Sequence, residues 1–271
     1  MNTFFLDRLN SEPHALAFAG QSTPWPVALA DQSANPALDE ALHTHAAAAQ
    51  ALLYPVSAEL LATTGRPVDL FGFEPNTARL GAAAAASASV PGIALTQLGA
   101  LLDAAALGYN PAQAKPVAVL GHSQGVLAVH MVQAICEAGS IDAAAAKIDE
   151  ILAIATLIGV AGTRQARQLG LAARHGEATP MLSVKDITRA QVDALIERVD
   201  GARGPIAVAV TNSATHYVLS GYPEDLAAFG VEVAKEHKRQ AKLREEKVRG
   251  GRVFDPTLEY LDVTLPLSLI H

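Results

Sequence analysis

Short apolar runs alternate with longer segments of helical periodicity over the first two thirds of the chain. Ala15–Ala19 (ALAFA) and Val117–Leu120 (VAVL) have the length and aliphatic character of buried strands. Strands that alternate with helices predict an α/β fold. Apolar residues at helical spacing predict helices at residues 38–53, 56–63, 93–107, 126–135 and 143–169, and Gly159–Gly162 could interrupt the last of these.

The pattern changes after Gly176. Residues 180–184 (PMLSV) predict a strand, and residues 188–199 predict a helix with Thr188 as its N-cap. The order strand, helix, strand, strand, helix resembles a split βαβ unit inserted into the main sheet. The last three elements of this unit are two strands within residues 206–221 and a helix at residues 223–235. The charged run that follows, residues 235–249, predicts a solvated helix end and linker.

The stretch Gly121–Gly125 (GHSQG) joins the predicted strand at 117–120 to the predicted helix at 126–135 without a spacer. A turn this sharp forces Ser123 into a sparsely allowed backbone conformation, and the two glycines let the strand and the helix approach closely enough to hold it there. This G-x-S-x-G pattern is that of a nucleophile elbow, so it predicts a nucleophilic Ser123. The alternative is a structural turn that happens to contain serine.

Composition narrows the class of protein. The chain has 271 residues, 50% of them hydrophobic and 5% aromatic, which favours helices packed closely on a sheet over a β-sandwich. A net charge of -7 gives no indication of a nucleic-acid-binding surface. The chain has a single cysteine, Cys136, so an intrachain disulfide is excluded, and the protein is expected in the reducing cytoplasm. No Cys or His lies at metal-ligand spacing from Cys136. Residues 1–10 lack an apolar signal-peptide core, and residues 81–90 are too short and weakly apolar to span a membrane.

A serine nucleophile needs a base and donors for the oxyanion. The backbone N–H of Gln124, the residue after the nucleophile, is one expected donor, at the N-terminus of the following helix. The second is expected from an early strand-end loop, and the backbone of Gln21 in Gly20–Ser22 is the best candidate. Taken alone, this Gly-Gln pair reads as an ordinary turn.

Three segments together resemble the malonyl/acetyl-CoA:acyl carrier protein transacylase family: AFAGQSTPW (17–25), GHSQGVLAV (121–129) and NSATHYVLSG (212–221). PMLSV and KVRGGRVFDPTLE (247–259) are similar to the N-terminal acetyltransferase domain of actinobacterial type I fatty acid synthase. The resemblance implies that an acyl group moves from coenzyme A to Ser123 and then to the phosphopantetheine thiol of an acyl carrier protein. It implies no tightly bound cofactor, and it implies other synthase domains as partners in a homo-oligomeric megasynthase.

The resemblance also implies a fold class: an α/β-hydrolase-like core with an inserted ferredoxin-like small subdomain, in agreement with the split βαβ pattern. Residues 1–176 are then the core with the elbow, and residues 177–240 are the small subdomain. Residues 241–271 are expected to return to the core, which is incomplete at its C-terminal end.

The choice of base among the nine histidines rests on the resemblance. The family carries its base after a late strand in a Pro-Phe-His-Ser pattern, and here Pro266–His271 (PLSLIH) places Ser268 at that position and His271 three residues later. Either His271 serves from a shifted loop, or the base is absent from this chain. His122 neighbours the serine and is expected to line the entrance. The family's Ser-His dyad requires no carboxylate.

The acyl group follows from one further position. Malonyl-selective members hold the substrate carboxylate with an arginine in an Arg-Gly step, which appears here as Ile158-Gly159. A malonyl carboxylate buried against isoleucine would lack a partner, at a cost on the order of several kcal/mol, so acetyl is the expected group. Ile158 can equally be a core residue. Asn212, in the third family segment, is expected to contact substrate.

Two other functions stay open. A serine thioesterase or esterase would need an acid between serine and histidine, for which Asp255 or Asp262 could serve, but the early GQS and the inserted subdomain argue against it. A chain that lacks its base could instead be a silent structural module of a megasynthase.

Overall fold

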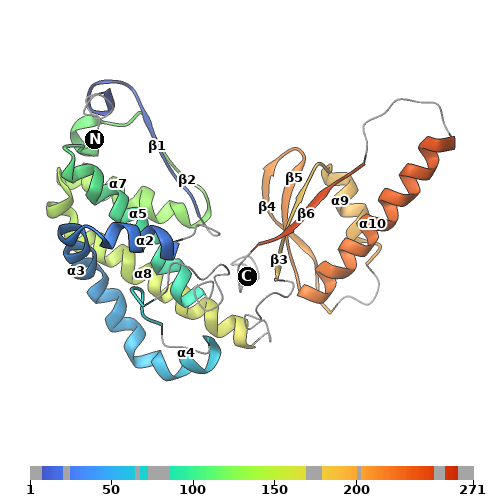
Figure 1. The fold of residues 1–271 in the computed structure, drawn as a ribbon, viewed down its shortest axis with the longest axis horizontal. Helices are drawn as coiled ribbons and strands as arrows, with labels where there is room; N and C mark the ends of the chain where they lie inside the picture. Colours follow the sequence, from blue (N-terminus) through green and yellow to red (C-terminus); the bar gives the residue numbers. More distant parts are fainter. Residues whose placement is uncertain are drawn as a thin grey trace. The chain divides into compact units, whose positions relative to one another are not determined.

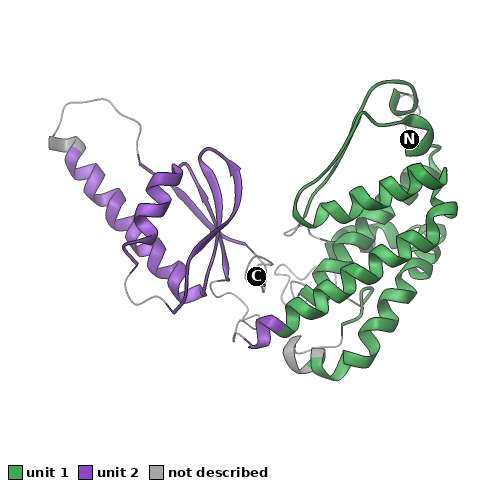
Figure 2. Cartoon of the chain, turned by 180° about the vertical axis from the view of Figure 1, so that it is seen from behind, with its two compact units in different colours: residues 1–164 green, residues 165–271 purple. Residues whose placement is uncertain are grey.

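The computed structural model forms two compact units, residues 1–164 and residues 165–271 (Figure 2). Each unit is described by itself. The structure describes residues 8–20, 25–64, 68–72, 86–168, 179–199, 203–246 and 254–261.

The described residues of the first unit form mainly helices and one pair of parallel strands (Figure 1). Strand β1 (Ala15–Phe18) pairs with β2 (Ala118–Gly121), in a register that runs from Ala15 opposite Ala118 to Phe18 opposite Gly121. The helices are α2 (Trp25–Ser33), α3 (Pro36–Leu53), α4 (Ser57–Thr64), α5 (Ala86–Ala106), α6 (Pro111–Ala114), α7 (Val126–Ala138) and α8 (Ile141–Gln168), with short 3-10 turns at Tyr54–Val56 and Ser123–Gly125.

Local sequence signals explain where several helices begin and end. Asn35 and Asn110 each precede a proline at the first helical position, and each side chain accepts a hydrogen bond from the backbone N–H two residues on. Helix α7 ends at Gly139, which has a φ of 91°, a left-handed conformation that glycine adopts without steric cost.

Helix α5 forms the centre of the first core. It contacts α2, α3 and α7, and its buried residues include Ile93, Leu95 and Leu98. Within the described part of the chain it is the one helix long and apolar enough to cross a membrane, but 72% of its most apolar window is buried in this unit. Burial in a protein core accounts for that apolar composition.

The second unit is a four-stranded antiparallel sheet with helices α9 and α10 packed on one face (Figure 1). The core on that face includes Leu182, Leu219, Leu226 and Phe229. The element order βαββαβ and the strand order β4-β5-β3-β6 are those of a ferredoxin-like fold. The elements are β3 (Met181–Lys185), α9 (Arg189–Ile196), β4 (Ala207–Ser213), β5 (His216–Ser220), α10 (Pro223–Glu246) and β6 (Thr257–Tyr260).

The structure corrects the predicted end of the small subdomain. The sequence pattern places that end at residue 240 and returns residues 241–271 to the core, whereas β6 pairs with β3 and completes the small sheet. The pairing is favourable because Leu258 packs on the helix-covered face and Leu261 packs beside Met181 and Val218. The first unit also ends at Arg164 rather than at residue 176.

Two helices run further than their patterns indicate. Helix α8 continues through Gly159–Gly162 without the predicted interruption, and the Gly159 α-carbon lies close to the Ala86 carbonyl, where a side chain would collide with α5. Helix α10 extends beyond residue 235, where Glu236 pairs with Arg239 at 2.6 Å and with Arg198 at 3.0 Å. The Glu236–Arg239 pair, three residues apart on one helix face, stabilises this charged part of the helix. The pair with Arg198 joins it to the segment that follows α9.

The α/β class and the ferredoxin-like subdomain are therefore confirmed. The hydrolase-like character of the core stays a prediction, because the described residues of the first unit contain only the pair β1 and β2.

Candidate active site

The stretch Gly121–Gly125 forms the predicted sharp turn. Strand β2 ends at Gly121, a 3-10 turn covers Ser123–Gly125, and α7 begins at Val126. Ser123 has a φ of 54°, which lies in the left-handed region that side chains rarely adopt. The residue is also exposed. A strained, accessible serine between a strand and a helix is the geometry of a nucleophile elbow.

The turn is possible because its two glycines, Gly121 and Gly125, have no side chains. A Cβ on Gly121 would lie 2.5 Å from the backbone nitrogen of Val126, and one on Gly125 would collide with the Phe18 carbonyl group on β1. The turn is closed by a hydrogen bond from the Gly125 N–H to the His122 carbonyl at 2.9 Å. A second bond, from the His122 N–H to the Phe18 carbonyl at 3.0 Å, attaches the turn to β1.

The segment after β1 lies directly against the elbow. A Cβ on Gly20 would be 2.5 Å from the His122 carbonyl oxygen and 2.6 Å from the Ser123 Cβ. It would also be 3.0 Å from the Gln124 backbone nitrogen, the expected oxyanion donor. The structure thus brings together the two segments from which the sequence predicts an oxyanion hole. Gln21, the expected second donor, lies outside the described residues.

Gln124 is buried at 5% exposure directly after the nucleophile. Among the described residues, neither its side-chain oxygen nor its side-chain nitrogen has a hydrogen-bond partner. A buried amide without partners is costly, so packing alone does not explain this side chain.

Three histidines of the first unit are engaged away from Ser123. His14 Nε2 lies 2.8 Å from the Tyr109 hydroxyl, and His45 Nδ1 lies 2.7 Å from Asp149. His43 stacks on the ring of Phe71 with centroids 3.7 Å apart. Each of these imidazoles thus contacts a residue outside the elbow. His271, the predicted base, lies outside the described residues, so its role stays a prediction.

The other predicted residues occupy different places. His122 is exposed beside Ser123. Ile158 is on α8, half-buried against the core of the first unit, which fits the reading as a core residue and leaves its place in an acyl pocket untested. Asn212 is exposed on β4 of the second unit, with its Nδ2 3.3 Å from His216 Nε2, which also lies 3.1 Å from Ser183 Oγ.

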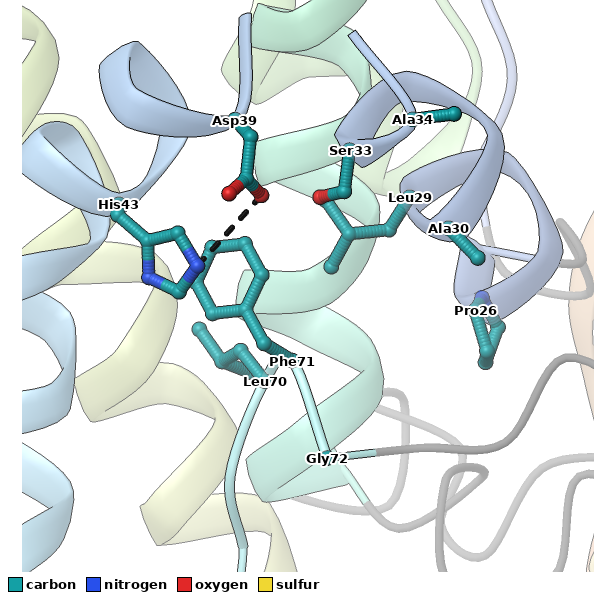
Figure 3. A pocket seen from close by; sticks show the side chains of 10 residues that line it. All are labelled: Pro26, Leu29, Ala30, Ser33, Ala34, Asp39, His43, Leu70, Phe71 and Gly72. Atoms are coloured by element: carbon teal, nitrogen blue, oxygen red, sulfur yellow. Dashed lines mark ion pairs between the residues drawn. The ribbon is translucent and has the colours of Figure 1, made fainter. Parts of the chain in front are cut away.

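The first unit also contains a cavity of about 620 Å³ (Figure 3). It is lined by residues of α2, α3 and the segment 68–72. On one side of it His43 Nε2 lies 3.5 Å from Asp39 Oδ1, and the His43 ring stacks on Phe71. None of the residues 121–125 lines this cavity, so it is distinct from the candidate active site.

One residue near the elbow is missed by sequence reasoning. Gln97 of α5, 8% exposed, donates from Nε2 to the carbonyl oxygen of Ala19 at 2.5 Å. The signal in the sequence is a lone amide in an otherwise apolar helical segment, IALTQLGALL (93–102). Such an amide needs a partner when buried, but the sequence does not indicate which one.

Comparisons with known proteins agree with the predicted resemblance. The fatty acid synthase central AT domain family matches residues 180–260, which span the small sheet from β3 to β6. The fatty acid synthase beta subunit hexB of Dothistroma septosporum is 30% identical over 128 residues, which are 42% of this chain and 7% of that protein. These matches confirm the resemblance of the chain to the acyltransferase domains of fatty acid synthases.

Solved structures show the same fold. The malonyl CoA-acyl carrier protein transacylase of Coxiella burnetii matches with a TM-score of 0.52 and 19% identity, over 94% of this chain and 63% of that one. The transacylase of the same description from Clostridium perfringens matches with a TM-score of 0.50 and 18% identity, over 94% and 62%. The chain therefore spans less than two thirds of these structures, and at such identities the likeness concerns the fold alone.

Proposed function

We propose that this chain is an acyltransferase domain that moves an acetyl group from coenzyme A, through an ester on Ser123, to the phosphopantetheine thiol of an acyl carrier protein. The observation that carries the proposal is the elbow itself. Ser123 is exposed at a φ of 54°, and Gly20 lies against its Cβ and beside the Gln124 backbone nitrogen. The family match over residues 180–260 adds the fatty acid synthase context.

The chemistry follows from the groups at the elbow. The Ser123 oxygen attacks the thioester carbonyl while the base, for which we nominate His271, takes the hydroxyl proton. The carbonyl oxygen becomes an anion, which the backbone N–H groups of Gln124 and Gln21 stabilise. The carbon–sulfur bond then breaks, and coenzyme A leaves as a thiol with the proton returned by the base.

The second half-reaction runs the same steps in reverse. The carrier thiol gives its proton to the base and attacks the ester carbonyl, the carbon–oxygen bond to Ser123 breaks, and the serine oxygen regains the proton. No tightly bound cofactor is needed, because both acyl carriers are substrates. We place this activity within a cytoplasmic, oligomeric fatty acid synthase, with acyl carrier protein as the partner and His122 at the entrance.

The assignment of acetyl rests on Ile158. In malonyl-selective members of the transacylase family that this chain resembles, the corresponding position holds the arginine that binds the substrate carboxylate. Isoleucine offers no charge to a malonyl carboxylate. We propose that Ile158 and Asn212 contact the substrate. The solved transacylases that share this fold are described as malonyl enzymes, so acetyl-CoA and malonyl-CoA must be compared directly.

Intact-mass measurement after mixing the protein with acetyl-CoA tests the function. We expect a stable increase of one acetyl group that is absent in Ser123→Ala and that disappears when reduced carrier phosphopantetheine is added. Release of free acetate without an adduct would indicate a hydrolase. No reaction with either acetyl-CoA or malonyl-CoA would contradict the proposed function and favour a structural module.

A further inference from the structure

Gln97 is a buried amide whose donor is used and whose acceptor is not. It lies on the apolar helix α5 between the buried residues Leu95 and Leu98 and is 8% exposed. Its Nε2 donates to the Ala19 carbonyl oxygen, whereas its Oε1 has no partner among the described residues. Burial of an amide in such surroundings costs free energy that one hydrogen bond offsets only in part. The side chain is therefore poorly explained by packing alone.

The carbonyl that Gln97 holds lies between this amide and the elbow. A Cβ on Gly125 would be 2.9 Å from the Ala19 oxygen, and the next residue, Gly20, lies against His122 and Ser123. Helix α5 also contacts the Ser123–Gly125 turn. The hydrogen bond from Gln97 thus fixes the peptide group from which the chain continues toward Gln21.

We infer that Gln97 is a positioning residue for the acyl transfer: it holds the Ala19–Gly20 segment, which directly precedes the expected second oxyanion donor in the sequence, against the elbow. This inference rests on the proposed function for its catalytic consequence. Gln97 acts through the backbone of Ala19 and Gly20 and need not touch the substrate. Small displacements of groups that stabilise an oxyanion reduce rates strongly, by up to about 100-fold for ~1 Å.

The chain provides a matched control in Gln32 on α2. Its Nε2 also donates to a backbone carbonyl of α5, that of Thr96 at 2.9 Å, and its Oε1 is also buried without a partner in the described structure. The Gln32 amide lies at the contact between α2 and α5, where a Cβ on Gly99 would meet it. Gln97→Met and Gln32→Met therefore each remove a partly buried hydrogen bond to a backbone carbonyl, one to Ala19 next to the elbow and one to Thr96 within α5.

Two measurements on both variants and the wild type test the inference. The first is hydrogen–deuterium exchange of peptides that contain Ala19 and Gly20, which does not depend on activity. We expect faster exchange in these peptides for Gln97→Met alone. The second is the acylation rate of Ser123 by acetyl-CoA and by malonyl-CoA. We expect Gln97→Met to lower kcat about 10- to 100-fold with KM for the acyl-CoA nearly unchanged, and Gln32→Met to lower neither.

The outcomes separate the inference from the proposed function. A wild type that neither acyl-CoA acylates contradicts the proposed function, and the exchange measurement still decides whether Gln97 holds the segment. Unchanged exchange at Ala19 and Gly20 in Gln97→Met overturns the positioning role, as does an equal loss of kcat in both variants. If Gln97→Met does not fold, Gln97→Asn, which keeps the amide but shortens its reach, is read in the same way.

Discussion

The two units of the chain differ in how far packing alone accounts for them. In the small unit every strand has an antiparallel neighbour, and the helix-covered face is filled by residues such as Phe229, which is fully buried. Among the described residues of the first unit, β1 and β2 pair only with each other, and two apolar residues are exposed there: Leu120 on β2 at 60% and Val117, directly before β2, at 71%. The first unit also places a strained, exposed Ser123 at the end of β2.

This difference indicates where selection for chemistry outweighs selection for packing. Local rules agree with one another through most of the small unit, where the exceptions are Asp186, with a φ of 61°, and the buried Ser220 hydroxyl, which has no partner among the described residues. At the elbow they conflict, because a non-glycine residue adopts a left-handed conformation and buried amides lack partners. Such conflicts persist at functional sites, where the strain serves the reaction. Five predictions use the contrast, from the largest expected effect to the smallest.

Alanine at a glycine should have opposite consequences in the two units. Gly125→Ala would force a Cβ into the Phe18 backbone, so we expect loss of acylation and a strongly lowered melting temperature. In the small unit, a Cβ on Gly230 of α10 meets only Leu258 at 3.7 Å. Gly230→Ala should therefore stabilise the protein by about 0.5–1 kcal/mol through helix propensity. Thermal melts of both variants test this, and equal changes would contradict the contrast.

Truncation of a side chain in the core of the small unit should lower its stability. Phe229→Ala removes a fully buried ring from the helix-covered face, and we expect a loss of about 3–5 kcal/mol in the free energy of unfolding of that unit. Val231→Ala, on the same helix but 54% exposed, should change it by less than about 0.5 kcal/mol. Denaturant unfolding measures both values, and a similar cost for the two variants would show that the core is not where the structure places it.

Ile158→Arg should shift acyl selectivity in the first unit. If this position faces the acyl group, the guanidinium would pair with a malonyl carboxylate and would be unpaired beside acetyl. We expect the malonyl-to-acetyl ratio of kcat/KM to rise about 10- to 100-fold. Ile158→Met is the control for size, and its ratio should stay near that of the wild type. An unchanged ratio in a folded Ile158→Arg would remove the main support for the acetyl assignment.

Glycine at the nucleophile should reveal the stored strain. Ser123 adopts a φ of 54°, which costs a residue with a Cβ about 1–2 kcal/mol. Glycine tolerates this conformation but also gains entropy in the unfolded chain, so part of the strain energy is offset. We expect Ser123→Gly to be about 1 kcal/mol more stable than Ser123→Ala, although both lack the hydroxyl. A more stable alanine variant in chemical unfolding would contradict a left-handed Ser123.

Glu236 should make the small unit sensitive to acid. Hydrogen bonds from Arg239, opposed by burial and supported by Gln240 and Arg198, lower the pKa of Glu236 to about 2. A carboxyl whose pKa is lower in the folded state stabilises above its unfolded pKa and loses that contribution as the pH falls toward 2. Since both arginines are about half exposed, we expect Glu236→Gln to cost about 1 kcal/mol at pH 7 and little near pH 2. A cost independent of pH would show that the charge does not matter.

Sequence patterns predicted the elbow and most of the small unit because both depend on local rules. The glycines two residues either side of Ser123 imply a close approach of strand and helix, and Thr188 with Gln191 forms the capping box that its position indicates. The fourth strand of the small sheet was missed although Thr257–Tyr260 (TLEY) alternates polar and apolar residues, because the run is only four residues long and follows a long charged segment. Its pairing with β3 is set by an open sheet edge, which only the tertiary structure creates.

The contacts around the elbow were harder to predict for the same reason. The contact of Gly20 with Ser123 and the bond from Gln97 to Ala19 join segments far apart in the sequence, and no local signal identifies such partners. The continuous helix α8 likewise depends on its close crossing with the start of α5 at Gly159, which makes a glycine there a packing residue rather than a helix breaker.

The most direct test of the account is the position of the acyl group on the protein. After reaction with acetyl-CoA, proteolysis and tandem mass spectrometry should place a single acetyl ester on Ser123. Ser123→Ala should remain unlabelled, and the Gln133→Ala variant on the exposed face of α7 should be labelled like the wild type. Acetyl found on lysines or on Cys136 instead, or labelling that persists in Ser123→Ala, would contradict the claim that the elbow serine is the nucleophile.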